Sequence, residues 1–169
     1  MDSIWRTGIW HQFGAAIDML DNAILACPEE LWGDRTQDQE YWYVTYHALF
    51  WLDLYLTGAV EGFVPPAPFT LDELDPAGLL PDRVYTKDEL HAYLLHCRTK
   101  CQETVNALTD ERAQHECVFG KRVMSFGELL LYNMRHVQEH AAQLSLILGQ
   151  KYGSAPGWVG SAISMPVGE

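Results

Sequence analysis

The stretch "FGELLLYNMRHVQEHAAQLSLILGQ", residues 126–150, decides the fold. Apolar residues recur in it every three or four positions, which predicts an amphipathic α-helix over the whole stretch. Ser125 followed by Glu128 is the capping-box pattern that marks a helix start. His136 and His140 interrupt the apolar stripe, and their spacing places them about 40° apart on the inward side of the helix. The segment therefore predicts a core-facing helix that carries two imidazoles.

The same apolar period occurs in three further segments. It predicts helices over residues 3–26, 37–57 and 87–108. The first carries a stripe made of Trp5, Ile9, Phe13, Ala16, Leu20 and Ile24. Capping boxes mark the other two starts, Thr36 with Gln39 and Thr86 with Glu89. No segment shows a convincing strand pattern, so we expect an all-α four-helix bundle with a long crossover between its second and third helices.

The expected crossover, "AVEGFVPPAPFTLDELDPAGLLPDRVY", carries five of the eight prolines. A segment of this length without regular structure is typical of a chain that crosses a bundle or covers a site. We expect it to pack down through its apolar side chains, Phe63, Val64, Phe69, Leu71 and Leu74. Residues 1–150 are then the bundle domain, and the Gly-, Ser- and Pro-rich residues 151–169 are an irregular C-terminal tail.

The charge and composition exclude several classes of partner. The net charge is −12, with 11 Lys and Arg among 169 residues, so we expect no nucleic-acid binding. No run of 18 apolar residues occurs, and the first residues lack the pattern of a signal peptide, so we expect no membrane association and a cytoplasmic protein. Cys97 and Cys101 lie on an apolar helix seam, where thiols are typically buried and structural.

A third histidine shares the inward position of the first two. His47 lies near the middle of the second expected helix, on one face with Tyr43 and Trp51. The other four of the seven histidines lie off the apolar seams or in a loop: His11, His91, His96 and His115. Buried imidazoles need partners. A divalent metal favoured by imidazole would provide one, and a hydrogen-bonded core cluster without metal is the alternative.

These residues also carry a family resemblance. The mid-helix His47 in "YHALFWLDLYL" and the H-x-x-x-H-x-x-Q-L segment "HVQEHAAQL" are similar to those of the DinB/YfiT-like superfamily of four-helix bundles. The long crossover and the chain length agree, so the resemblance covers residues 1–150. Two departures are Glu139, where many relatives have histidine, and Ala141-Ala142, where they often have Arg-Gly. These departures affect substrate choice rather than the ligands.

The resemblance implies a metal site. It implies that His47, His136 and His140 bind one divalent metal, with zinc as the first choice and nickel or iron as alternatives. It also implies a homodimer and a small-molecule substrate. Characterised relatives transfer low-molecular-weight thiols such as bacillithiol or mycothiol, and others are described as hydrolases. Five residues are expected to line the pocket or to support the ligands: Tyr43, Trp51, Tyr132, Asn133 and Gln143.

Two functions follow, and one rival motif remains. The first function is a metal-dependent enzyme that activates a thiol or water for transfer to, or hydrolysis of, a small molecule. The second is a non-enzymatic metal-binding or stress-response protein with a structural three-histidine site. The rival motif is H-x-x-E-H, in which Glu139 would be the general base of a peptidase. That class needs a further acidic ligand downstream, and only Glu169 follows.

Overall fold

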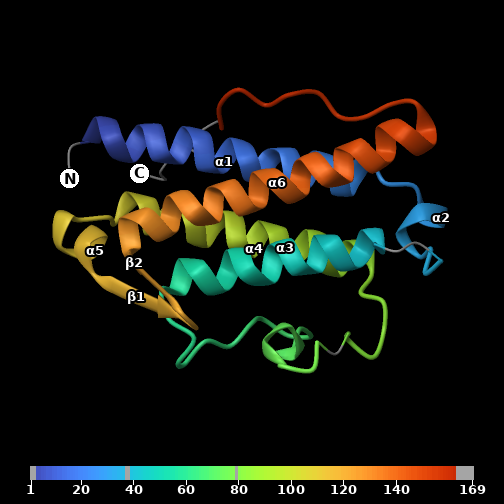
Figure 1. The fold of residues 1–169 in the computed structure, drawn as a ribbon. Coiled ribbons are helices and arrows are strands. Elements are labelled where there is room, and N and C mark those ends of the chain that lie inside the picture. Colours follow the sequence, from blue (N-terminus) through green and yellow to red (C-terminus); the bar gives the residue numbers. More distant parts are fainter. Residues whose placement is uncertain (1–2, 37–38, 79, 163–169) are drawn as a thin grey trace.

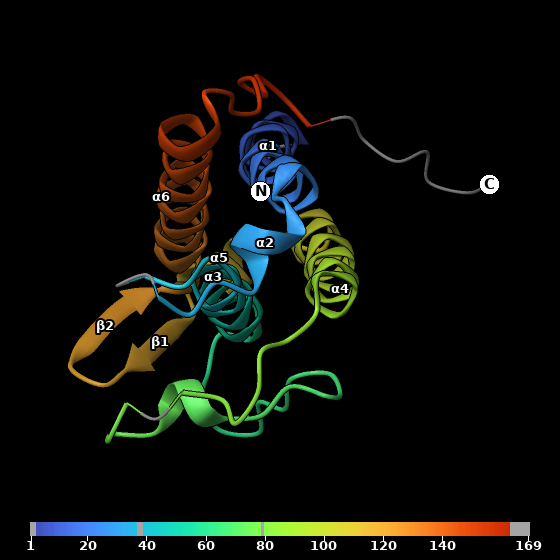
Figure 2. The ribbon, with the colours of Figure 1, turned by 90° about the vertical axis from the view of Figure 1, so that its right-hand side faces the viewer.

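Four long helices form the framework of the protein. The computed structural model describes residues 3–36, 39–78 and 80–162. Its long helices are α1 (Ser3–Ala26), α3 (Tyr41–Thr57), α4 (Lys87–Asn106) and α6 (Phe126–Tyr152). They lie side by side, and the view along their axes shows them around a common centre (Figures 1 and 2). Helix α1 packs against α4 and α6, and α3 packs against the same two helices. The apolar core fills the space between them.

Local sequence signals explain several helix ends. The Thr86 side chain accepts a hydrogen bond from the Glu89 backbone N–H, and the Glu89 carboxylate accepts one from the Thr86 backbone, which confirms this capping box. Ser125 caps α6 by accepting from the backbone N–H of Glu128. Helix α3 ends at Gly58, whose φ of 86° is the left-handed conformation that glycine adopts most readily. These residues fix the lengths of α3, α4 and α6.

The predicted start of the second helix is wrong. Helix α3 begins at Tyr41, and the expected cap Thr36 instead donates from its N–H and its hydroxyl to the carboxylate of Asp34, at 2.9 and 2.6 Å. This local turn satisfies the threonine without a helix. Residues 37–38 of the expected helix lie outside the described part of the chain. A short helix, α2 (Glu29–Trp32), precedes this turn.

The predicted apolar stripe of the first helix needs one correction. Trp5 is 69% exposed, because the first turns of α1 extend beyond the core. Trp10 is buried in its place, together with Phe13 and Leu20 from the predicted stripe. The spacing of the predicted stripe agrees with the buried face of α1, but the packed part of the helix begins about one turn later than expected.

A β-hairpin departs from the all-α prediction. Strands β1 (Glu116–Phe119) and β2 (Arg122–Ser125) pair antiparallel, and they follow a short helix, α5 (Asp110–Gln114). The two-residue turn between them contains Gly120 at a φ of +61°. Four-residue strands are too short to show a clear alternation of apolar and polar residues. The Gly-Lys pair between two valine-containing segments is nevertheless a sequence pattern that indicates a β-hairpin.

The segment expected to be the crossover, residues 58–86 between α3 and α4, packs against the long helices through aromatic side chains. It contains one 3-10 turn, η1 (Asp72–Leu74). Phe63 and Phe69 are buried, and the ring of Phe69 stacks on Tyr93 of α4 with 4.4 Å between centroids. Two residues do not pack as expected. Val64 is 80% exposed and Leu71 is also exposed, because the phenylalanines and the half-buried Leu74 provide the contacts with the core.

Residues 153–162, which follow Tyr152, are irregular and pack against α1. The Ala162 N–H donates to the carbonyl of His11 at 2.9 Å, and the Gln12 side-chain amide donates to the carbonyl of Gly160 at 3.2 Å. Gly14 makes room for this approach, since a Cβ atom there would lie 2.5 Å from the side chain of Ala162. Figure 1 shows this segment running back along α1.

A buried ion pair joins α3 to α4. Asp53 is 1% exposed, and its carboxylate lies 2.5 Å from the ammonium group of Lys100. The Tyr93 hydroxyl donates to the other carboxylate oxygen at 3.0 Å. Lys100 also donates to the Thr57 hydroxyl at 2.8 Å. The buried charge is therefore fully hydrogen-bonded, as burial of a carboxylate requires.

Cysteines and membrane segments give two further results. Cys97 and Cys101 are buried free thiols, as predicted, and burial raises the pKa of both. Within residues 3–36, 39–78 and 80–162, none of the helices has the length and apolar character that a bilayer crossing requires.

Candidate metal centre

Three imidazoles from two helices converge between α3 and α6. The Nε2 atom of His136 lies 3.4 Å from Nε2 of His47 and 3.1 Å from Nε2 of His140. One ligand atom from each of the three rings lies within 4.8 Å of the others. All three side chains are half-buried. Such a spacing fits one ion coordinated by three nitrogens, and in the described part of the chain no other group of acidic, cysteine or histidine side chains has this geometry.

Hydrogen bonds on the outer ring nitrogens orient two of these imidazoles. Nδ1 of His47 lies 2.7 Å from the carboxylate of Glu73, and Nδ1 of His140 lies 2.9 Å from the side-chain carbonyl of Gln143. Each acceptor assigns the ring hydrogen to Nδ1, which leaves the Nε2 lone pair free to bind a metal. Nδ1 of His136 is buried and has no hydrogen-bond partner among the described residues.

Glu73 is held in a set of three hydrogen bonds. Its side chain is 4% exposed, and besides His47 it accepts from the indole N–H of Trp51 at 2.9 Å and from the hydroxyl of Tyr43. Burial opposes ionisation of this carboxyl group, but the three hydrogen bonds outweigh burial and lower its pKa. Glu73 is therefore an ionised carboxylate behind His47, which is a common arrangement behind metal-binding histidines.

The electrostatic environment keeps two of the imidazoles neutral. Burial, together with the neighbouring His140 and His47, lowers the pKa of His136 to about 3. Burial and His47 also lower the pKa of His140, against the opposing hydrogen bond to Gln143. Neutral imidazoles are the form that binds a metal, so these two rings are ready to do so at pH 7. Nitrogen donors of this kind suit zinc, nickel and iron, and the residues fit a divalent ion.

The five predicted supporting residues divide into two groups. Tyr43 and Trp51 hold Glu73, and Gln143 holds His140. For the other two, the hydrogen bonds found among the described residues go elsewhere. The Tyr132 hydroxyl accepts a hydrogen bond from Arg122, and the buried Asn133 side chain donates to the carbonyl of Leu52 in α3. Asn133 therefore joins two helices, and Tyr132 lies toward the hairpin.

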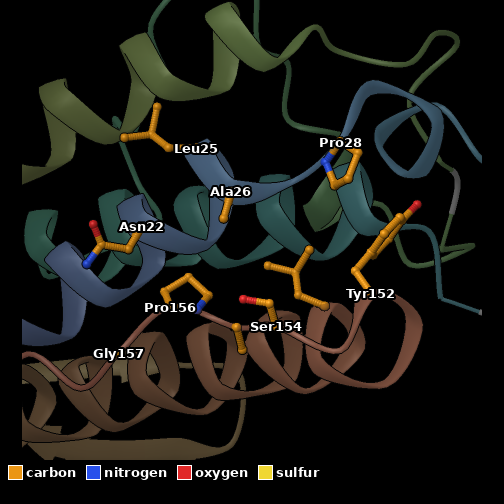
Figure 3. Close-up of a pocket in the computed structure, with 10 residues that line it drawn as sticks. Asn22, Leu25, Ala26, Pro28, Tyr152, Ser154, Pro156 and Gly157 are labelled. Atoms are coloured by element: carbon orange, nitrogen blue, oxygen red, sulfur yellow. The ribbon is translucent and has the colours of Figure 1, made fainter.

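A pocket of about 320 Å³ opens beside the imidazoles. Its lining comes from the start of α3, the middle of α6 and the crossover: Gln39, Glu40, Tyr43, Val44, His47, Leu80, His140 and Gln143. A larger pocket, of about 690 Å³, lies between the C-terminal ends of α1 and α6 and the tail, and contains none of the three histidines (Figure 3). The smaller pocket gives a ligand access to His47 and His140.

The sequence of residues 12–144 matches the profile of the DinB superfamily. The match includes the three histidines, the crossover and most of the four long helices. The chain belongs to the DinB superfamily. No curated protein and no solved structure gives a significant match.

The geometry of this DinB-superfamily chain does not support the peptidase motif. Glu139 is exposed and lines a separate pocket of about 470 Å³, with Gln12, Trp158 and others, on the face between α1 and α6. It does not line the pocket beside His47 and His140. The carboxylate at the histidines is Glu73, which sequence reasoning missed.

We expect the Glu73→Gln variant to bind zinc about tenfold or more weakly than the wild type, because a neutral amide orients and polarises His47 less strongly than a carboxylate. Competition with a chromophoric chelator measures this affinity. Asp72→Asn is the matched control, since it removes the same charge from the adjacent residue of η1 and should leave the affinity unchanged. Equal affinities of both variants would contradict a role for Glu73 at the metal centre.

Proposed function

We propose that His47, His136 and His140 hold one divalent ion, zinc first and nickel or iron as alternatives, inside a four-helix bundle whose crossover is residues 58–86. The observation that carries this proposal is the convergence of three Nε2 atoms, two of them with Nδ1 engaged by a polar side chain. Membership of the DinB superfamily supports the proposal.

We further propose that the protein is an enzyme acting on a small molecule. Three protein ligands leave coordination positions open, as in catalytic zinc sites. A bound divalent ion supplies Lewis acidity, which lowers the pKa of a water or thiol and polarises an oxygen of the substrate. The pocket beside His47 and His140 supports this function over a closed structural site, because it gives a second molecule room next to the ion.

The chain's own residues would position the reacting groups. Glu73 retains the Nδ1 hydrogen of His47, and Gln143 retains that of His140, so neither ring can rotate without losing a hydrogen bond. The hydroxyl of Tyr43 and the indole N–H of Trp51 donate to the Glu73 carboxylate and hold it against His47. The reaction would be transfer to, or hydrolysis of, the small molecule by a thiol or water. The thiol cofactor, the homodimer and the cytoplasmic location stay predictions.

Metal removal tests the proposal directly. We expect the purified protein to bind close to one equivalent of zinc, nickel or iron, measured by elemental analysis after dialysis against each ion. Free metal at about 1,000 times its dissociation constant stabilises the folded state by about 4 kcal/mol, which raises Tm by about 8–16 °C in a chain of this size. A chelator should reverse the shift. Protein that binds no metal and melts at the same temperature with and without each ion would reject the centre.

A further inference from the structure

We infer that the substrate of the proposed centre carries no negative charge on the part that lies beyond the ion. This inference rests on the proposed function and names the class of molecule that its pocket accepts. The substrate is a compact neutral or cationic molecule with an apolar portion, which a metal-binding group at one end anchors to the ion.

The charges around the pocket carry the first part of the argument. None of its lining residues is lysine or arginine, and its one lining carboxylate is Glu40. The guanidinium of Arg35 lies 3.3 Å from the carboxylate of Glu40 and pairs with it. The carboxyl group of Glu73, 2.7 Å from Nδ1 of His47, is a second acidic group next to the site. A negative charge at the end of a ligand away from the ion would lie near Glu40 and would find no lysine or arginine in the pocket lining, which disfavours it.

The uncharged polar side chains of the pocket lining provide the second part of the argument, which concerns the hydrogen bonds that a ligand can make. The Gln143 amide donates to the side-chain carbonyl of Gln39, and its own carbonyl accepts from His140. The amide nitrogen of Gln39 has no hydrogen-bond partner among the described residues, so it can donate to a ligand. An uncharged acceptor such as a carbonyl, amide or ether oxygen suits this donor. Val44 and Leu80 provide an apolar wall for the rest of the molecule.

The volume limits the size of the substrate. About 320 Å³ is at the lower end of the range of small-molecule pockets. A large thiol would therefore extend out of the pocket into solvent. An anionic thiol would find no cationic side chain in the pocket lining. The pocket fits a molecule with one short apolar body.

Three isosteric hydroxamates test the inference on the zinc-loaded protein. Benzohydroxamates with a 4-carboxylate, a 4-carboxamide or a 4-amidinium group place the same metal-binding end on zinc and differ only in the charge at the far end. We expect the carboxylate to bind about tenfold or more weakly than the carboxamide, and the amidinium to bind at least as tightly as the carboxamide. Isothermal titration calorimetry measures the three dissociation constants, and metal-free protein shows how much of the binding depends on zinc.

Two charge variants sharpen the test. Leu80→Arg supplies the missing cation at the pocket, so the gap between carboxylate and carboxamide should shrink to about threefold or less. Leu146→Arg adds the same charge at an exposed position of α6 outside the pocket, and it should leave the gap unchanged. Zinc-dependent binding with no preference against the carboxylate would overturn the inference alone. Failure of all three hydroxamates to bind in a zinc-dependent way would overturn the proposed function as well.

Discussion

The His136→Ala variant should bind zinc more than about a hundredfold more weakly than the wild type. The Nε2 atom of His136 lies close to both other imidazoles, 3.4 Å from that of His47 and 3.1 Å from that of His140. Its removal leaves two nitrogens that cannot enclose an ion. Loss of a supporting side chain outside the ligands commonly costs about 10- to 100-fold in metal affinity, and loss of a ligand costs more. Chelator competition measures the change.

The control for this variant is His115→Ala. His115 is exposed next to β1 and far along the chain from the three imidazoles, so its loss should leave the affinity unchanged. His140→Ala provides a second test at a more accessible side chain. Circular dichroism shows whether each variant is folded. A folded His136→Ala protein that binds zinc within about threefold of the wild type would show that this residue is not a ligand.

The largest expected effect on stability is that of Lys100→Met, which should lower the free energy of unfolding by about 3–5 kcal/mol. The variant keeps the apolar stem of the lysine but leaves the carboxylate of Asp53, 1% exposed, without its cation. The hydrogen bond from Tyr93 and the His96 imidazole, whose Nε2 lies 3.7 Å from the carboxylate, remain but do not replace the ammonium group. Urea denaturation followed by circular dichroism measures the loss.

Two comparisons identify the cause of this loss. The double variant Asp53→Asn/Lys100→Met removes the uncompensated charge and should recover a large part of the stability. Arg83→Met breaks an exposed ion pair with Glu89 and should cost much less. A Lys100→Met protein as stable as the Arg83→Met protein would show that the buried pair contributes little.

Local signals predicted the helical framework well. Thr86 with Glu89 and Ser125 with Glu128 marked helix starts correctly, because a capping box acts within one turn and needs no tertiary context. The same pattern failed at Thr36, whose hydroxyl found a closer acceptor in Asp34. A threonine that can bond to a carboxylate two residues earlier does not need a helix N-terminus.

The sequence predicted the meeting of the three histidines but not the carboxylate that contacts His47. Helical spacing puts His136 and His140 on one inward face, and the structure brings His47 to them. Their role as ligands stays a prediction. Glu73 could not be placed from the sequence, because it lies in an irregular proline-rich segment whose path over α3 depends on long-range aromatic contacts. The same reason explains why the exposed Val64 was predicted to pack.

The crossover divides into two parts that differ in how firmly they are tied to the helices. Phe63, Phe69 and Glu73 anchor its first part by burial, ring stacking and a shared carboxylate. Residues 75–78 are exposed, and Leu80, on the pocket wall, is exposed as well. Changes in this second part are therefore expected to alter which molecules enter, while the first part keeps His47 and Glu73 in place. Divergence of substrate preference among homologues would then not require loss of the proposed metal centre.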